Sequence, residues 1–287
     1  MPVQLVKVAD ARDTTTVLYY GDGGSGKTSS LASMANLGRV LYVDAEAGIK
    51  RKPLEGLGVD VDNVEMLRIQ GLDFPTLEEV FEMVKADLDD DADAWTGVVW
   101  DSGTEIYQAL LQESVTTRVK RFAARGESNA KSDPFFIDRD DWGRANGEFR
   151  QLIRRFRDLP CHFGTAFLPR RDQDDNGKVH VGPSISPGLQ ADLIGWHDIV
   201  CHTTYDDESG LYMGRFKPHG VYQGKDRYSA LPNVMVDPTF ERIIGYISGE
   251  LVEDNDPRQD ALNGADDDTP SPTPIRAAKP AAKASRG

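Results

Sequence analysis

Apolar and polar positions along the chain alternate between strand-like and helix-like patterns. Short apolar runs predict strands, and the stretches between them show the three-to-four-residue period of helices with one buried face. The predicted strands are 16–20, 40–44, 64–69, 97–102 and 161–168, and the predicted helices are 29–36, 75–88, 104–124 and 141–159. This order favours an α/β fold with a mostly parallel central sheet and helices on both faces.

The last part of the pattern predicts strands without helices between them. Three runs are strand-like, at 198–205, 211–216 and 233–236. Gly210 separates the first two and predicts a tight hairpin, so an antiparallel extension is expected at one end of the sheet. The stretches at 126–138 and 169–187 are polar and are interpreted as loops, and a short lead-in strand is expected at 3–8.

Composition divides the chain into a body and a tail. Between 250 and 268 eight acids face one base, and 269–287 is rich in Pro, Ala, Lys and Arg. Neither stretch has enough apolar residues to pack. We therefore expect one domain at 1–249 and a disordered tail, first acidic and then basic, at 250–287. The acidic part of the tail supplies half of the net charge of −14, so the charge does not exclude a nucleic-acid partner.

The strongest chemical signal follows the first predicted strand. It fits the pattern G-x-x-x-x-G-K-[ST], and its residues are Gly21, Asp22, Gly23, Gly24, Ser25, Gly26, Lys27 and Thr28. Glycines let backbone N–H groups point at a polyphosphate, and the following helix adds its positive end. Lys27 would reach the β- and γ-phosphates of ATP, Thr28 would hold Mg²⁺, and Ser29 is expected to line the same site. A chance glycine-rich turn is the alternative.

Two acids complete the predicted site. Asp101 ends a buried strand at the sheet edge where ligands bind in open α/β folds, and it is expected to hold Mg²⁺ through water. Its alternative role is to cap the next helix. Hydrolysis also needs a base that orients the attacking water. Many ATPases have a glutamate directly after the strand-end aspartate, but Ser102 stands there. Glu46, just after the strand 40–44, is the better candidate, and Glu105 is the second.

Two stretches resemble the bacterial RecA recombinase family. They are Leu41-Tyr42-Val43-Asp44-Ala45-Glu46-Ala47 and Leu57-Gly58-Val59-Asp60-Val61-Asp62-Asn63, which are similar to the family's DAE and LGVDxDN runs. The resemblance covers 17–102 and looks closer to compact RecA-like ATPases of bacteriophages, which act in single-strand annealing and recombination, than to cellular RecA. It implies that Glu46 activates the water. It also implies single-stranded DNA, a homo-oligomeric ring or filament, and a phage single-strand-binding protein as partners.

Two later features compare with the same family. In the RecA pattern the strand that corresponds to 161–167 ends in a glutamine that senses the γ-phosphate. Here the end of that strand, Gly164-Thr165-Ala166-Phe167, offers only Thr165 as a polar group. Lys225 and Arg227 resemble the family's K-x-K/R element, which reaches the γ-phosphate of a neighbouring subunit. The resemblance implies that these cations stabilise transition-state charge in trans. Arg215 and Lys217 are the fallback pair, and an ordinary solvated loop is the alternative.

Two polar stretches are the candidate contacts to single-stranded DNA. The stretch 118–131 has five bases against Glu127, and these bases are Arg118, Lys120, Arg121, Arg125 and Lys131. The stretch 169–187 holds Arg170, Arg171, Lys178 and His180. Phosphates need cations and unstacked bases need aromatic faces, for which Phe122, Phe135 and Phe136 are the candidates. The alternative is a core phenylalanine on a helix whose basic face is merely solvated.

Together these patterns predict a Mg²⁺-dependent, DNA-stimulated ATPase that binds single-stranded DNA as a homo-oligomer in recombination or annealing. Two alternatives stay open. One is a nucleotide-gated loader or clamp with slow turnover, and the other is a kinase that acts on small molecules or nucleotides. No run of about 20 apolar residues is present, so no membrane partner is expected. The expected location is the cytoplasm, or the host cytoplasm if a phage encodes the chain.

Overall fold

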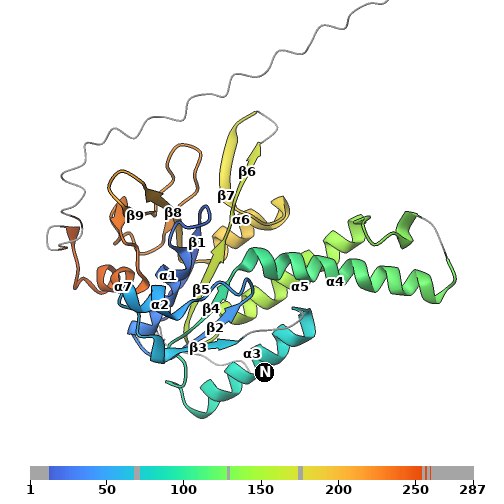
Figure 1. The fold of residues 1–287 in the computed structure, drawn as a ribbon, viewed down its shortest axis with the longest axis horizontal. Coiled ribbons are helices and arrows are strands. Elements are labelled where there is room, and N and C mark those ends of the chain that lie inside the picture. Colours follow the sequence, from blue (N-terminus) through green and yellow to red (C-terminus); the bar gives the residue numbers. More distant parts are fainter. Residues whose placement is uncertain are drawn as a thin grey trace, which may run out of the picture.

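A computed structural model gives the arrangement of the chain in space (Figure 1). It describes residues 13–67, 72–127, 130–173, 177–253, 256 and 259. A nine-stranded sheet lies at its centre, and helices cover both faces. The predicted lead-in strand at 3–8 lies outside the described residues.

Six strands of the central sheet are parallel to one another. In spatial order they are β3 (Val64–Leu67), β2 (Val40–Asp44), β4 (Gly97–Asp101), β5 (His162–Phe167), β1 (Thr16–Tyr20) and β8 (Ile199–Asp206). Antiparallel pairing extends the sheet beyond β8 through β9 (Leu211–Arg215), β11 (Val234–Val236) and the short β10 (Lys225–Asp226). The predicted α/β fold with an antiparallel extension is therefore confirmed. Gly210 has a φ of 71° in the turn between β8 and β9, as the hairpin predicted there requires.

Each face of the sheet has its own hydrophobic core, because side chains alternate between the faces. In one core the Trp100 ring meets Phe156 and Phe163 edge-on, at centroid distances of 4.9 and 5.3 Å. This face is covered by α3 (Phe74–Asp90), α4 (Gly103–Ala124), α5 (Arg139–Arg157) and α6 (Pro187–Trp196). The other face is covered by α1 (Lys27–Ala32), η2 (Ser33–Asn36), α2 (Arg51–Gly56), η3 (Val61–Asn63) and α7 (Phe240–Ser248). No helix among the described residues is long and apolar enough to cross a membrane.

The stretch 169–187 is not the polar loop that the sequence predicted. It forms a two-stranded antiparallel ribbon of β6 (Pro169–Gln173) and β7 (Val179–Pro183), which we call the hairpin, and α6 begins at Pro187. The hairpin forms a separate two-stranded sheet and projects from the body (Figure 1). β6 is partly exposed and carries Arg170, Arg171 and Asp172, whereas β7 is interrupted by His180, Gly182 and Pro183. Neither strand therefore has the apolar run that marks a buried strand.

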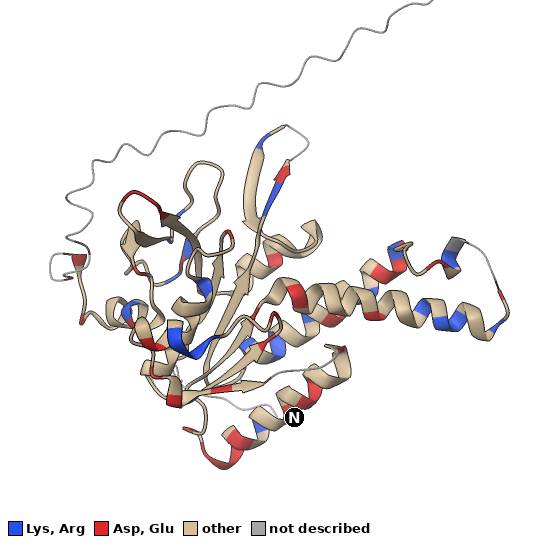
Figure 2. Cartoon of the chain, viewed as in Figure 1, with Lys and Arg blue, Asp and Glu red and all other residues tan. Residues whose placement is uncertain are grey.

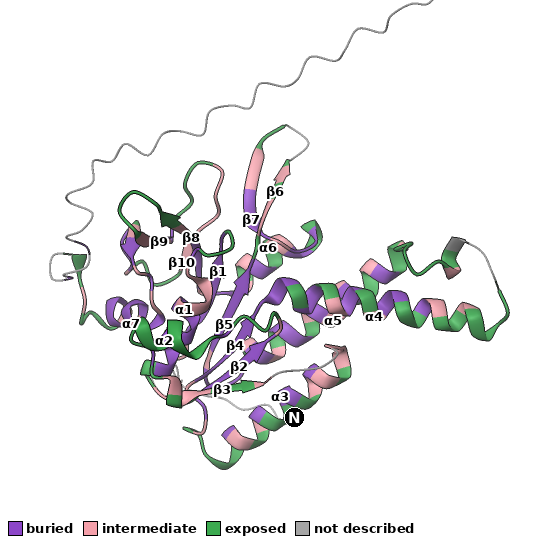
Figure 3. Cartoon of the chain, viewed as in Figure 1, coloured by how far each residue is buried: buried purple, intermediate pink, exposed green. Residues whose placement is uncertain are grey.

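The far half of α4 and the chain that returns from it to the first turn of α5 extend from the sheet together as an arm (Figure 1). We define the arm as residues 116–127 and 130–141, which include η4 (Ala130–Ser132). Figure 3 shows the contrast along α4, whose first turns are buried against the sheet while its far end is exposed. The far end of the arm therefore lies outside the central core.

The described chain packs further toward its C-terminus than predicted. Asp256 is 3 % exposed and accepts hydrogen bonds from Arg242 and from the Tyr246 hydroxyl. Gln259 is also buried, and its side chain bonds the backbone of β11 at Val236. The predicted boundary at 249 is therefore wrong, because the acid at 256 belongs to a buried ion pair and not to a solvated tail. From the sequence alone Asp256 was assigned to the acidic tail, because its partner Arg242 lies 14 residues earlier in the chain.

Candidate functional site

The loop between β1 and α1 is closely fitted on one side and open on the other. A side-chain carbon built on Gly21 would lie 2.2 Å from the Thr203 carbonyl oxygen, and one on Gly26 would lie 2.8 Å from the Tyr212 ring. Gly24 and Gly26 also have φ angles of 82° and 87°, which favour glycine. By contrast, a carbon built on Gly23 or Gly24 meets no atom within 4 Å. This open backbone is where a phosphate chain can approach.

Lys27 closes over the same loop. Its Nζ donates to the carbonyl oxygens of Gly21 and Asp22, at 2.7 and 2.8 Å. Burial lowers the pKa of Lys27, and the nearby negative charges of Asp101 and Glu46 act in the opposite direction. The structure thus brings the lysine of the loop within electrostatic reach of both acids that the sequence singled out.

Asp101, at the end of β4, meets the first turn of α1. Its Oδ2 accepts hydrogen bonds from the Thr28 hydroxyl at 2.6 Å and from the Tyr42 hydroxyl at 2.7 Å. The side chain is 6 % exposed, and burial raises the pKa of Asp101. The sequence did not single out Tyr42. Its position two residues before Asp44 in β2 puts both side chains on the same face of the sheet. Its contact depends on β2 lying beside β4, which only the sheet order reveals.

Glu46 lies beside the residue that follows Asp101. Ser102 donates its hydroxyl hydrogen bond to Glu46 Oε1, and the Ala45 amide donates to the Asp101 carbonyl oxygen at 2.7 Å. Glu46 is exposed, so water can reach it. Glu105 is also exposed, but it lies in the first turn of α4, where its amide donates to the Ser102 side chain. Ser102 therefore caps α4, a role that its residue type allows, and also holds Glu46, a contact that the sequence did not indicate.

The oxygen-rich edge formed by these residues fits Mg²⁺. Hydroxyl and carboxylate oxygens are the ligands that this ion prefers, and a buried carboxylate such as Asp101 gains from a nearby cation. Asp44 ends β2 in register with Asp101, and its Oδ2 is buried with no hydrogen-bond partner among the described residues. The donor set and the open loop together suit a nucleoside triphosphate with its metal ion.

A cavity continues from the loop along α1. It has a volume of about 210 Å³, and Ser29, Ser33, Tyr212, Asp237 and Thr239 are among its lining residues. Ser29 was predicted to line the site, and its hydroxyl donates to the Gly26 carbonyl oxygen at 2.9 Å. A ring beside the loop and polar groups in a cavity are features that suit the base of a nucleotide.

Thr165 does not lie at this edge of the sheet. It is fully buried, and its hydroxyl lies 3.1 Å from His197 Nε2. Burial lowers the pKa of His197 to about 4, so the pair is a neutral hydrogen bond in the core. The position compared with the sensing glutamine is therefore occupied by a core residue.

Lys225 and Arg227 lie near the start of β8, at the opposite end of the parallel strands from the loop. Lys225 Nζ donates to three carbonyl oxygens at the end of α6, those of Ile194, Gly195 and His197. Arg227 forms an ion pair with Asp198, the residue before β8, at 2.8 Å. Neither cation can reach the loop of its own chain. A role at a neighbour's nucleotide stays a prediction.

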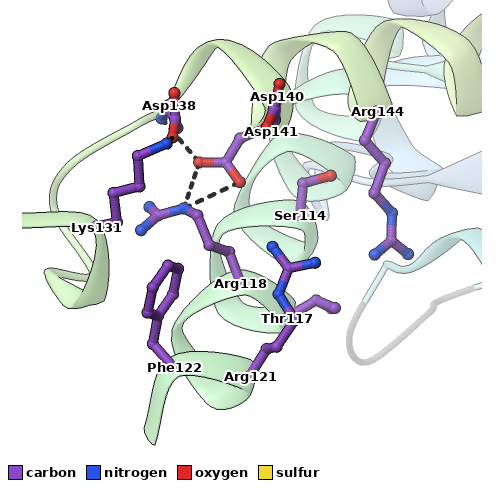
Figure 4. Close-up of a pocket in the computed structure, with 10 residues that line it drawn as sticks. All are labelled: Ser114, Thr117, Arg118, Arg121, Phe122, Lys131, Asp138, Asp140, Asp141 and Arg144. Carbon is purple, nitrogen blue, oxygen red and sulfur yellow. Dashed lines mark hydrogen bonds and ion pairs between the residues drawn. The ribbon is translucent and has the colours of Figure 1, made fainter. Parts of the chain in front are cut away.

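Several bases of the stretch 118–131 are engaged within the arm. Figure 4 shows a cavity of about 210 Å³ in which Arg118 lies against Asp141, and both side chains are 4 % exposed. Lys131 pairs with Asp138 at 2.6 Å. The interpretation of all five bases as free for DNA is therefore wrong, since acids 23 and 7 residues further along the chain neutralise two of them. Lys120, Arg121 and Arg125 are exposed.

The sheet, the open glycine loop and the oxygen-rich edge define a nucleotide-binding P-loop domain. A sequence model of a family described as AAA domain matches residues 13–228, and the chain belongs to that family. The chain is thus an AAA-type ATPase domain, a class whose members bind ATP and Mg²⁺. No curated protein matches the chain.

Proposed function

We propose that this domain is a RecA-like ATPase in which Glu46 activates the water that attacks the γ-phosphate. One observation carries the proposal. Glu46 accepts a hydrogen bond from Ser102, directly after Asp101, at the edge that also holds Lys27 and Thr28. The base and the phosphate loop therefore share one end of the sheet, as hydrolysis requires.

Each residue of the site has a separate part in this reaction. The loop amides and Lys27 bind the phosphates, and the charge of Lys27 stabilises the negative charge that builds up in the transition state. Thr28 and Asp101 would hold Mg²⁺, which neutralises phosphate charge when bound. Ser102 orients the Glu46 carboxylate, so that it can accept a proton from water.

Glu46→Gln tests the proposal. Glutamine keeps the shape of the side chain and accepts the hydrogen bond from Ser102, but it cannot take a proton at neutral pH. We expect affinity for a fluorescent ATP analogue to stay within about twofold, while phosphate release slows by about 10²–10⁴-fold. Glu105→Gln is the matched comparison and should hydrolyse ATP normally. Normal turnover of Glu46→Gln together with a slow Glu105→Gln would move the base to Glu105.

We further propose that single-stranded DNA binds to the arm and the hairpin and stimulates the ATPase. Lys120, Arg121 and Arg125 supply exposed charge on α4 (Figure 2), and the Phe135 side chain is 93 % exposed on the same arm. On the hairpin, Arg171 and Lys178 are exposed. Exposed cations beside an exposed aromatic ring suit a strand whose phosphates need charge and whose bases stack.

Charge variants test the DNA partner with a fluorescent oligothymidylate. Replacing Lys120, Arg121 and Arg125 by Ala, or Arg171 and Lys178 by Ala, should weaken binding, because cations that neutralise phosphates release counterions. The slope of log K against log salt should fall by roughly 1 for each phosphate that the variant no longer neutralises. The double variant Lys50→Ala/Lys52→Ala removes exposed charge elsewhere and should leave affinity unchanged. The DNA proposal fails if the wild type does not retain the oligonucleotide at low salt, or if its ATPase rate is the same with and without it.

Assembly is the remaining part of the proposal. We propose a homo-oligomer, a ring or a filament, that serves recombination or annealing beside a phage single-strand-binding protein. The resemblance of Lys225 and Arg227 to the K-x-K/R element supports it. In the folded chain Lys225 donates to the His197 carbonyl oxygen and Arg227 pairs with Asp198, so both cations would exchange these contacts for a neighbour's nucleotide. Their charge would then stabilise the transition state in the adjoining subunit.

A further inference from the structure

The residue directly before the phosphate loop is tied to the hairpin. Tyr20 is fully buried at the end of β1, and its hydroxyl donates to the Gln223 carbonyl oxygen at 2.6 Å. A second, longer bond of 3.3 Å runs from this hydroxyl to the Val181 carbonyl oxygen in β7. The start of the loop and the base of the hairpin therefore meet at one side chain.

A stack of rings makes a second connection. His202 in β8 stacks on Tyr222 at a centroid distance of 4.1 Å and an interplanar angle of 16°, and it lies 5.1 Å from the Tyr20 ring. Its Nδ1 is buried and has no hydrogen-bond partner among the described residues. The ring is held by its stacking, and so it can follow a shift of β8 without breaking a hydrogen bond at that nitrogen.

The phosphate loop touches the neighbour of His202. Ser25 Oγ and Thr203 Oγ1 lie 2.8 Å apart, and Gly21 packs directly on the Thr203 carbonyl oxygen. Asp22 is close enough to His202 to raise its pKa, although burial is the larger effect and lowers it to about 4. A rearrangement of the loop around phosphates therefore acts first on Thr203 and on the ring beside it.

The other end of the stack holds the hairpin by its backbone. The Val181 amide donates to the Val221 carbonyl oxygen at 2.7 Å, and the Gln223 amide donates back to the Val181 carbonyl oxygen at 3.1 Å. Tyr222 lies between these two bonds and pairs with Val181 as an isolated β-bridge. Displacing the Tyr222 ring thus displaces the root of β7.

We propose that His202 and Tyr222 are positioning residues that transmit the state of the phosphate loop to the hairpin. The inference rests on the proposed nucleotide site and names how that site would control its DNA partner. It supplies a connection that Thr165, buried against His197, does not make. Coupling of this kind is a free energy shared by two sites and must appear as a change at one when the other is filled.

Hydrogen exchange of the full chain, with and without a non-hydrolysable ATP analogue and Mg²⁺, tests the inference without DNA. The amides of Val181 and Gln223 are the reporters. In the wild type we expect the analogue to change their exchange rates by roughly 5–50-fold. In Tyr222→Ala and His202→Leu the ratio should fall to near 1, although a fluorescent analogue still binds. Tyr222→Phe and His202→Phe keep a stacked ring and should keep the ratio, as should His219→Ala, an exposed ring in the same loop.

The possible failures are distinct. A wild type that binds no nucleotide would overturn the proposed function and this inference together. A wild type that binds the analogue without any change at Val181 and Gln223 would overturn only the inference. So would Tyr222→Ala or His202→Leu with a wild-type ratio. Because the ratio compares one variant with and without analogue, a uniform loss of stability in that variant would not imitate the expected result.

Discussion

At the scale of single residues, Asp101 combines a cost to stability with a use in the reaction. Burial raises its pKa above the ordinary value of 3.8, so the folded protein holds this proton more tightly than the unfolded chain does. The ionised carboxylate therefore destabilises the fold at neutral pH, and this cost shrinks as pH falls through the raised pKa. Such a residue is retained where a cation offsets its charge.

Asp101→Asn should therefore separate stability from activity. At pH 7 we expect a higher free energy of unfolding than in the wild type, measured by chemical denaturation without Mg²⁺. The advantage should shrink as pH falls through the raised pKa of Asp101, where the wild-type carboxyl takes up its proton. Hydrolysis of ATP should drop by about 10–100-fold, as for other residues that hold a metal ion through water. Asp207→Asn, an exposed acid, is the control. A variant less stable than the wild type at pH 7 would contradict the assignment.

Much of the site at this scale could be predicted from contiguous residues. The loop from Gly21 to Thr28 is a single run, and Asp101 and Glu46 each follow an apolar strand. The contacts of Tyr42 and Ser102 with the two acids were not predicted, because they depend on β2 and β4 being neighbours, which no local pattern reveals. Residues that hold other site residues in place have no motif of their own.

At the scale of elements, the arm depends on one buried ion pair. Arg118 Nε donates to both carboxylate oxygens of Asp141, at 3.1 and 2.8 Å, and joins α4 to the first turn of α5. Removing one partner leaves a buried charge uncompensated. We expect Asp141→Ala to lower the free energy of unfolding by about 3–5 kcal/mol, as measured by urea denaturation. Arg144→Ala breaks a more exposed pair with Glu148 and should cost at most about 1 kcal/mol. Equal effects of the two variants would show that the Arg118 pair does not hold the arm.

The elements that the sequence missed share a physical cause. β6 is partly exposed and charged, and β7 has only two apolar residues before its glycine and proline, so the pairing of these strands is fixed by the partner strand and not by an apolar period. The buried faces of β1, β4 and α5 were predicted because tertiary packing requires an apolar period there. Charge patterns misled for the same reason, since Arg118 and Asp256 find partners that are distant in sequence.

At the scale of the whole molecule, the last described residues fasten the antiparallel edge of the sheet. Truncation after Gln259 keeps the Arg242–Asp256 pair and the bonds of Gln259 to β11, whereas truncation after Gly249 removes them. We expect the longer chain to unfold like the wild type. The shorter one should be less stable, because Arg242 loses its ion-pair partner and β11 loses both hydrogen bonds to Gln259. Equal stability of the two truncations, measured by urea denaturation, would show that this segment only rests on the surface.

Assembly can be tested by mixing two inactive chains. A Lys225→Ala chain keeps its loop and Glu46 but lacks the Lys225 cation for a neighbour, whereas a Glu46→Gln chain offers that cation but cannot activate water. If Lys225 acts in trans, each variant alone is slow, while an equal mixture regains about a quarter of the wild-type rate, the share of sites with an intact base and an intact neighbour. Since Lys225 also bonds three carbonyl oxygens at the end of α6, Lys225→Ala has a structural effect of its own, and the mixture excludes that effect as the explanation. A destabilised chain gains nothing from a partner with a dead site, so a mixture that is no faster than the average of its components would refute the role in trans.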